Sequence, residues 1–175
     1  MNKWILKSQI RKQLKNNSIE HRYLNMKDIG TILILFDTEN YGEVDAFVKQ
    51  LKRMGKKVTA YAFKEKKDTG DYSGSPFQIV TDKEAYDWFK NHLKTLAEEM
   101  KKTHQDALFD LTIRENLALE YLCANADASI KVGFKKNNYP LYDLSFSALN
   151  VKDNHENLKV RELGRQMIHY LSTIR

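Results

Sequence analysis

Apolar residues along the chain gather in short continuous runs that alternate with stretches of helical spacing. The first run, residues 31–36, has the unbroken apolar character of a strand that is buried on both faces of a sheet. After a polar turn, residues 44–51 carry apolar side chains at helical spacing, and residues 58–63 form a second apolar run. A strand, a helix and a strand in this order predict a right-handed parallel βαβ unit.

The second half of the chain repeats this order. Residues 107–113 and 129–134 are predicted strands, and residues 115–126 are a predicted helix between them. Shorter strands are predicted at residues 77–80 and 142–146. The alternation predicts a three-layer α/β domain of the Rossmann-like or flavodoxin-like type, with a mainly parallel sheet of about five strands and helices on both faces.

Capping residues mark two further helices. Thr81 followed by Glu84 is a capping box at the start of a long helical stripe, and a break in this helix near Asn91 stays open as an alternative. Asp153 with Glu156 marks the start of a helix near the C-terminus. These helices complete the alternating pattern of the predicted domain.

Basic residues concentrate ahead of the predicted domain. Leu6, Ile10 and Leu14 recur every four residues and place one apolar stripe beside a cationic face on a short helix. The bases that precede the first acidic residue are Lys3, Lys7, Arg11, Lys12 and Lys15. Removing these five charges from the formal net charge of +6 leaves +1 for the rest of the chain. We therefore divide the chain into a basic helical arm with its connector, residues 1–28, and a single α/β domain, residues 29–175.

The apolar stripe of the arm is expected to dock on another surface. We favour its own domain or a second subunit, and the latter would make the protein a homo-oligomer through the N-terminal helix. Nucleic acid or an anionic membrane surface is the alternative partner of the arm.

A cytoplasmic location is predicted from the cysteine content and the hydropathy of the chain. Cys123 is the single cysteine, so neither an intramolecular disulfide nor a Cys-rich zinc site can form. The longest strongly apolar run covers residues 32–36, whereas a membrane span needs about 20 apolar residues. The sequence therefore predicts a protein that is neither exported nor membrane-spanning.

Candidate site residues follow from where open parallel sheets bind their ligands, which is outside the carboxyl ends of the strands. Two groups of polar side chains follow the first and the fourth predicted strand. The candidates are Asp37, Thr38 and Asn40 after the first strand, Asp110 in the fourth strand, and Thr112, Arg114, Glu115 and Asn116 after it. A small ligand or a protein partner is expected to bind at this edge.

Asp37, Asp110 and Asn40 each have a structural interpretation as well. Asp37 directly follows a buried apolar run, so its carboxylate must find water, a hydrogen-bond donor or a cation at the sheet edge. Asp110 interrupts an apolar strand, and we favour its pairing with a Lys or Arg over a functional role. Asn40 and Glu43 have the spacing of a helix cap and its partner, so capping weighs at least as much as function.

No cofactor is predicted for this chain. The turn after the first strand contains only Gly42, and neither G-x-G-x-x-G nor a Walker A pattern occurs, which disfavours dinucleotide and nucleoside triphosphate binding. The histidines form no H-x-x-x-H pair and no zinc motif. The alternative is a divalent cation, which Asp37 and Asp110 could share through oxygen ligands if their carboxylates converged.

Three runs of the chain resemble a family of small bacterial proteins known as a domain of unknown function. They are residues 109–113 (FDLTI), 120–122 (EYL) and 128–134 (ASIKVGF). The resemblance extends to the basic N-terminal helix and to the strand end at residues 34–37 (ILFD). It implies an α/β fold and a cytoplasmic protein, and it brings no activity or catalytic residues.

Two shorter stretches are similar to parts of enzymes. Residues 106–134 resemble the strand, helix and strand ending in V-G-F of the N-terminal lobe of heptosyltransferase-like glycosyltransferases, but the chain has no room for their second lobe. Residues 36–40 are similar to the D-x-x-N strand end of NYN and PIN-type ribonucleases, with Asp37 and Asn40 matching. The later S-G-D-x-D type motif of those nucleases has no counterpart in this sequence.

These observations lead to three hypotheses about function. The first is a noncatalytic module that binds a protein partner or a small ligand, because a well-patterned fold carries no recognisable catalytic set. The second is a metal-dependent ribonuclease or phosphoesterase that uses Asp37 and Asp110. The third is attachment to nucleic acid or to a membrane through the basic arm.

Overall fold

Six parallel strands form one sheet in the computed structural model, which describes residues 3–16, 22–87, 91–147 and 159–174. The strands are β1 (Thr31–Asp37), β2 (Lys57–Lys64), β3 (Gln78–Thr81), β4 (Gln105–Asp110), β5 (Ala128–Phe134) and β6 (Leu144–Phe146). Their order across the sheet is β3-β2-β1-β4-β5-β6, which is the order of doubly wound Rossmann folds. The predicted parallel sheet is confirmed, with one strand more than expected.

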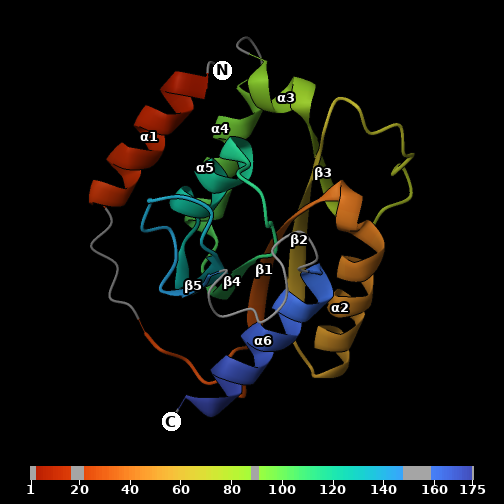
Figure 1. The fold of residues 1–175 in the computed structure, drawn as a ribbon, viewed down its shortest axis with the longest axis vertical. Coiled ribbons are helices and arrows are strands. Elements are labelled where there is room, and N and C mark those ends of the chain that lie inside the picture. The colour runs from red at the N-terminus through yellow and green to blue at the C-terminus, as the bar shows by residue number, and fades with distance from the viewer. Residues whose placement is uncertain (1–2, 17–21, 88–90, 148–158, 175) are drawn as a thin grey trace.

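Helices cover both faces of this sheet (Figure 1). The helices are α1 (Lys3–Asn16), α2 (Tyr41–Arg53), α3 (Asp82–Tyr86), α4 (His92–Lys102), α5 (Leu117–Asn125) and α6 (Val160–Thr173), with the 3-10 turn η1 (Thr38–Asn40) between β1 and α2. α2 and α6 pack on one face, and α1, α4 and α5 pack on the other. None of the helices described here is long and apolar enough to cross a membrane.

Two hydrophobic cores follow from the alternation of side chains along β1. Ile32, Ile34 and Phe36 belong to the core beneath α2 and α6, whereas Leu33 and Leu35 belong to the core beneath α1, α4 and α5. All five side chains are buried, because helices cover both sides of a central parallel strand. The continuous apolar run of β1 therefore serves both cores.

The apolar stripe of α1 packs on the domain to which the helix is joined. Leu6 and Ile10 have no exposed surface, and Leu14 packs against the same cluster. In Figure 1, α1 lies along the side of the molecule next to α5. Of the surfaces considered for this stripe, its own domain is the one that covers it, so the stripe is not free for a second subunit.

On either side of the loop between β4 and α5, the element ends differ from the predicted ones, and polar side chains explain both. β4 ends at Asp110, earlier than predicted, because the Asp110 carboxylate accepts a hydrogen bond from the Thr112 amide (2.9 Å) and turns the chain. α5 begins at Leu117, later than predicted, because Asn116 is its N-cap and accepts from the Leu119 amide (3.2 Å). The loop between β4 and α5 carries four of the candidate site residues.

Asn40 occupies the predicted N-cap position of α2, but the predicted side-chain cap is absent. η1 runs directly into α2, so Asn40 has a φ of −104° and a ψ of 17°, and its side chain makes no cap hydrogen bond. Glu43, the expected partner, instead accepts a hydrogen bond from the Arg161 amide (2.9 Å). This contact joins α2 to α6.

The capping box at Thr81 is confirmed, and the long helix after it is interrupted. Thr81 Oγ1 accepts from the Glu84 amide (3.2 Å), and Glu84 Oε2 accepts from the Thr81 amide (2.9 Å). Asn91 has a left-handed φ of 47°, which a continuous helix does not allow, so α3 and α4 are separate. The helix start predicted at Asp153 and Glu156 lies outside the described residues.

Candidate functional site

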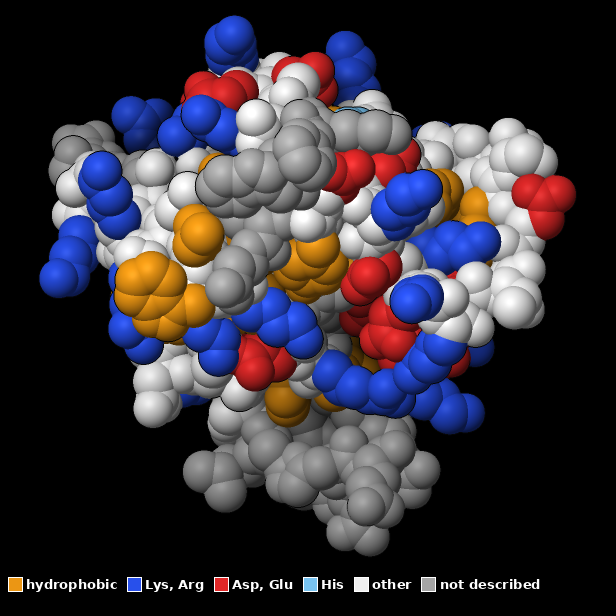
Figure 2. Space-filling view, turned by 90° about the horizontal axis from the view of Figure 1, so that it is seen from above, with side chains coloured by type: hydrophobic (Ala, Val, Ile, Leu, Met, Phe, Trp, Pro, Cys, Tyr) orange, Lys and Arg blue, Asp and Glu red, His pale blue; other side chains and the backbone are white. Residues whose placement is uncertain are grey.

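β1 and β4 are neighbours at the centre of the sheet, and they pair in parallel with Leu35 opposite Asp110. From these two strands the order runs outward in opposite directions, to β3 on one side and to β6 on the other. This is the topological switch point, where open α/β sheets form a crevice for ligands. The loops after β1 and β4 therefore open onto the same edge, as predicted. Figure 2 views the molecule from the side of α3, and acidic side chains lie there beside lysines.

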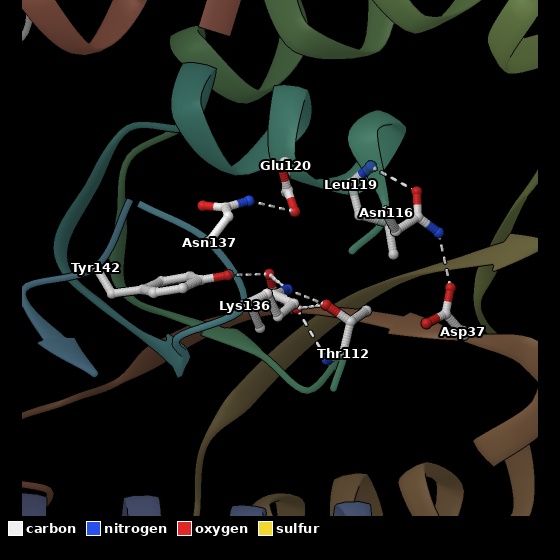
Figure 3. A network of polar contacts seen from close by, with 9 residues as sticks. Asp37, Thr112, Asn116, Leu119, Glu120, Lys136, Asn137 and Tyr142 are labelled. Atoms are coloured by element: carbon white, nitrogen blue, oxygen red, sulfur yellow. Dashed lines mark hydrogen bonds and ion pairs between the residues drawn. The ribbon is translucent and has the colours of Figure 1, made fainter. Parts of the chain in front are cut away.

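Asp110 is fully buried at the end of β4 and is held by a network of donors. Figure 3 labels these donors, Thr112, Lys136 and Tyr142. The Asp110 Oδ1 atom accepts from the Thr112 amide (2.9 Å) and the Thr112 hydroxyl (2.5 Å). Its Oδ2 atom accepts from Lys136 Nζ (2.8 Å) and the Tyr142 hydroxyl (2.6 Å). Lys136 also donates to the Thr112 hydroxyl. The predicted pairing of Asp110 with a base is confirmed, and the Lys136 and Asp110 side chains are only 2% and 0% exposed.

Gly133 on β5 leaves the space in which the Tyr142 ring lies. A methyl group at Gly133 would overlap that ring. Burial and the neighbouring Asp110 carboxylate raise the pKa of Tyr142 well above its ordinary value, so its hydroxyl keeps the proton that it donates. The absence of a side chain at Gly133 therefore lets a phenol from the loop before β6 reach the end of β4.

Glu120 of α5 is a second buried carboxyl group at this edge. Its Oε1 atom accepts from Asn137 Nδ2 (3.1 Å), whereas its buried Oε2 atom has no hydrogen-bond partner within the described part of the chain. Burial raises the pKa of Glu120 to about 7, against the opposing effect of Lys136. Near neutral pH Glu120 is therefore a mixture of carboxylic acid and carboxylate.

Asp37 ends β1 and is held by the loop before α5. Its Oδ1 atom accepts from Asn116 Nδ2 (2.8 Å), while Asn116 Oδ1 caps α5. Burial raises the pKa of Asp37 to about 6; the hydrogen bond from Asn116 opposes this shift, and the charge of Asp110 adds to it. Asn116 thus uses both ends of its amide, and the structure joins two candidate residues from different strands.

Two cavities at this edge share part of their walls, and we call them together the edge groove. The smaller has a volume of about 430 Å³ and the larger about 550 Å³. The smaller is lined by Asp37, Thr38, Glu39, Phe63, Glu65, Lys67, Asp68 and Tyr72, and the larger by Lys3, Lys7, Phe63, Glu65, Lys66, Lys67, Asp82, Tyr86, Glu115, Asn116 and Leu117. The hydrogen bond from Asn116 to Asp37 links the larger cavity to the smaller.

The loop after β2 is anchored beside Asp37 by Thr38. The Thr38 side chain is buried and its hydroxyl donates to Asp68. Asp68 also accepts from the Gly70 amide (2.8 Å) and the Tyr72 hydroxyl (2.9 Å), and these hydrogen bonds, that of Thr38 foremost, lower the pKa of Asp68. The Tyr72 ring packs on Tyr41, with 5.2 Å between the ring centroids. Thr38 therefore shapes the wall of the edge groove.

The other candidate residues lie at the margin of the groove or outside it. Glu115 lines the groove and lies 3.9 Å from Lys7. Arg114 is largely exposed and lies 3.5 Å from Glu39. Asn40 is the last residue of η1 and is not part of the lining described above. The geometry thus concentrates the site on Asp37 and Asn116.

Asp110 has little capacity left to bind a metal ion. Each of its oxygens already accepts two hydrogen bonds, and the Lys136 ammonium supplies the positive charge that a cation would bring. No group of three or more metal-ligating side chains occurs among residues 3–16, 22–87, 91–147 and 159–174. The edge groove instead places hydrogen-bond acceptors next to ammonium groups and aromatic rings.

One family model covers nearly the whole chain: DUF6913, a family of unknown function, matches residues 2–174. The chain belongs to DUF6913. This membership confirms the main resemblance seen in the sequence, to a domain of unknown function. No curated protein and no solved structure matches the chain significantly. The weaker similarities to ribonucleases and glycosyltransferases stay predictions.

The polar network of this DUF6913 chain includes three residues that sequence reasoning missed: Glu120, Lys136 and Asn137. Glu120 is the only charged residue of α5, all of whose residues are buried. A lone charge in an apolar helix is a signal that could have identified it. Lys136 and Asn137 follow β5 in a polar segment with no such signal, because only the pairing of β4 with β5 brings them to Asp110 and Glu120.

Proposed function

We propose that this domain binds a small ligand that carries hydroxyl groups and an anionic group in the edge groove. The observation that carries the proposal is the position of Asp37, at the switch point and in the wall of a cavity. Both cavities have volumes in the range of small-molecule sites, which favours a small ligand over a protein partner. We propose a cytoplasmic location because the single cysteine allows no intramolecular disulfide.

Asp37 and Asn116 are the proposed hydroxyl-binding pair. Asn116 is the single hydrogen-bond donor to Asp37 among the described residues, so the carboxylate has capacity to accept from a ligand. Asn116 fixes the orientation of this carboxylate because its own side chain is held as the α5 cap. A partly buried carboxylate that accepts from a hydroxyl forms a charge-assisted hydrogen bond, which is stronger than a neutral one.

Lysines of the larger cavity are the proposed contacts for the anionic group. Lys3 and Lys7 come from α1, and Lys66 and Lys67 come from the loop after β2. The existing ion pairs of Lys7 with Glu115 and of Lys67 with its neighbour Glu65 are solvent-exposed. Exposed ion pairs contribute about 0–1 kcal/mol each, so an anionic ligand can replace them at little cost.

Catalysis is not part of this proposal. A metal-dependent hydrolase would need Asp110 to bind the cation, and its oxygens are already occupied by donors from Thr112, Lys136 and Tyr142. We assign Asp110 and Lys136 the task of fixing the loop after β4, which holds Asn116 in place.

A thermal-shift screen with sugar phosphates and mononucleotides tests the proposed function. A ligand present at about 100 times its Kd adds about 2.7 kcal/mol to the free energy of unfolding. For a chain of this size the melting temperature then rises by about 5–11 °C. If no member of either ligand class raises the melting temperature, the proposal is wrong.

Asp37→Asn tests the assignment of the groove. This variant keeps the oxygen that accepts from Asn116 but removes the charge, so we expect the Kd of the ligand to rise about 10- to 100-fold. Asp28→Asn makes the same chemical change at an exposed position that does not line the groove, and it should leave the Kd unchanged. An equal Kd for wild type and Asp37→Asn would place the ligand elsewhere.

A further inference from the structure

One face of α1 consists of cationic and polar side chains and one tryptophan. Trp4, Lys7, Ser8, Arg11, Lys12 and Lys15 recur at helical spacing and line a groove of about 440 Å³. We call this surface the α1 cationic face. α1 contains no acidic residue, so the positive charge of the helix is not neutralised from within. Figure 2 shows lysine and arginine side chains beside apolar ones on its left, the side of α1 in Figure 1.

The α1 cationic face is open to solvent. Trp4 exposes 75% of its surface, and Lys12 and Lys15 are exposed as well. The Arg11 guanidinium lies 5.7 Å from the centroid of the Tyr139 ring, a cation–π contact with the body of the domain. The face is therefore an accessible surface on a helix that is anchored from behind.

The burial of the apolar stripe of α1 decides between two classes of polyanion. A helix that binds a membrane surface inserts an apolar face at the level of the headgroups. Leu6 and Ile10 are already buried in the domain, and Trp4 is the one large apolar side chain of the cationic face. Single-stranded nucleic acid is bound by cations that follow its backbone and by aromatic rings on which bases stack. The α1 cationic face provides both features.

We propose that the α1 cationic face binds single-stranded nucleic acid, either RNA or DNA, through Trp4, Arg11, Lys12 and Lys15, none of which lines the edge groove. The phosphates lie along Arg11, Lys12 and Lys15, and a base stacks on the ring of Trp4. From Trp4 to Lys15 the face is about 17 Å long, at a helical rise of ~1.5 Å per residue. This length accommodates several phosphates of an extended strand.

Fluorescence anisotropy with labelled single strands tests this proposal. The probes are RNA and DNA strands of about 20 nucleotides, longer than the ~4–16 nucleotides that single-strand-binding folds occupy. If the three cations Arg11, Lys12 and Lys15 contact phosphates, the affinity falls about 20-fold between ~50 and ~200 mM salt. Absence of binding at low salt, or binding that does not respond to salt, overturns the proposal.

A double variant tests the charge of the face. Lys12→Gln with Lys15→Gln should weaken binding and reduce the salt slope by about 1.4, because two phosphate contacts are lost. The matched control, Lys52→Gln with Arg53→Gln, removes the same charge from α2, on the other side of the molecule (Figure 1). We expect the control to bind as the wild type does. An equal loss in both double variants indicates an effect of net charge alone and overturns the proposal.

Substitution of Trp4 tests base stacking. Trp4→Ala should weaken binding about 5- to 150-fold, whereas Trp4→Phe retains most of the affinity because a smaller ring still stacks. Trp4 is exposed, so both variants should keep the melting temperature of the wild type. Vesicles of phosphatidylserine and phosphatidylcholine test the rival partner. Binding to these vesicles without binding to single strands overturns the proposal, as does an unchanged affinity in Trp4→Ala.

Discussion

Asp106 at the amino edge of the sheet has a lowered pKa, whereas Asp37 and Glu120 at the carboxyl edge have raised pKa values. At the amino edge, Asp106 Oδ2 accepts from the Gly30 amide (2.8 Å), the Thr31 amide (2.8 Å) and the Thr31 hydroxyl (3.1 Å). Burial raises the pKa of Asp106, but these hydrogen bonds outweigh burial and the net shift is downward. At the carboxyl edge, burial dominates for Asp37 and Glu120, and their pKa values rise to about 6 and about 7.

This difference distinguishes a carboxylate that stabilises the fold from carboxyl groups that are available to bind a ligand. Asp106 is ionised and joins the start of β1 to the start of β4, which stabilises the native state. Asp37 and Glu120 keep fewer donors than a buried carboxylate needs, which costs stability. Perturbed carboxyl groups of this kind gather at functional sites, so the contrast between the edges supports the carboxyl edge as the site.

Of the substitutions proposed here, loss of the Lys136 ammonium should lower the free energy of unfolding the most. Asp110 is a fully buried carboxylate of the carboxyl edge with a full set of donors, and Lys136→Met leaves its charge buried without a counterion. We expect the free energy of unfolding to fall by about 3–5 kcal/mol, measured by urea denaturation at neutral pH. Lys135→Met, at the exposed neighbouring position, should change it by less than about 0.5 kcal/mol. Similar losses in both variants would show that Asp110 does not depend on Lys136.

Glu120→Gln should stabilise the protein, in a manner that depends on pH. The pKa of Glu120 is about 7 in the folded chain against 4.5 in the ordinary group, so the folded state holds the proton more tightly. For the wild type, this proton's contribution to stability is complete below pH ~4.5 and is lost as the pH rises through about 7. The neutral amide avoids this loss, so Glu120→Gln should be more stable by up to about 3 kcal/mol at pH ~8.

The measurement for Glu120→Gln is the melting temperature of both proteins between pH ~4.5 and ~8. The two curves should coincide at the acidic end and separate towards the basic end. A variant that is less stable than the wild type at basic pH would mean that the ionised carboxylate has a partner, and Glu120 would then resemble Asp106.

Asp106→Asn should destabilise the protein, in contrast to Glu120→Gln. The pKa of Asp106 is lowered on folding, so the stability from its carboxylate is present above the unfolded value of ~3.8 and is lost as the pH falls below it. Replacing the charged acceptor should cost about 2 kcal/mol at neutral pH, and the difference should shrink in acid. Chemical denaturation at two pH values measures this. A stabilising effect at neutral pH would remove the contrast between the two edges.

Arg114→Ala should have the smallest effect. Arg114 is 71% exposed, and its pair with Glu39 at 3.5 Å lies in solvent. We expect a change in the free energy of unfolding of less than about 0.5 kcal/mol, and an unchanged Kd for any ligand of the edge groove. A large loss of affinity in calorimetric titration would show that Arg114 contributes to ligand binding.

Most of the fold could be predicted because its signals are local. The run before Asp37 is apolar at every position, so a doubly covered strand was the interpretation that accounted for it. The Thr81 capping box was visible as a spacing of three residues. The Asn40 prediction failed on the same kind of spacing, because the 3-10 turn before α2 changed the backbone at that residue.

The candidate site could be predicted only as a location. The rule for parallel sheets pointed to the ends of β1 and β4, and both lie at the switch point. The same rule could not show that Asp37 is partly buried and that Arg114 is exposed, because it gives the position along the chain and not the burial of a side chain. The rule did not identify Glu120 or Lys136, because neither directly follows β1 or β4.

The strands, most of the helices, the parallel sheet and the buried stripe of α1 could be predicted from the order of residues, since these depend on the periodicity of neighbouring residues. Tertiary structure alone decided which carboxyl groups are satisfied. Two donors to Asp110, Lys136 and Tyr142, come from 26 and 32 positions away in the chain, and the donor to Asp37 comes from 79 positions away. The protonation of a buried carboxyl group depends on such donors and on solvent exclusion, which exist only after the strands have paired.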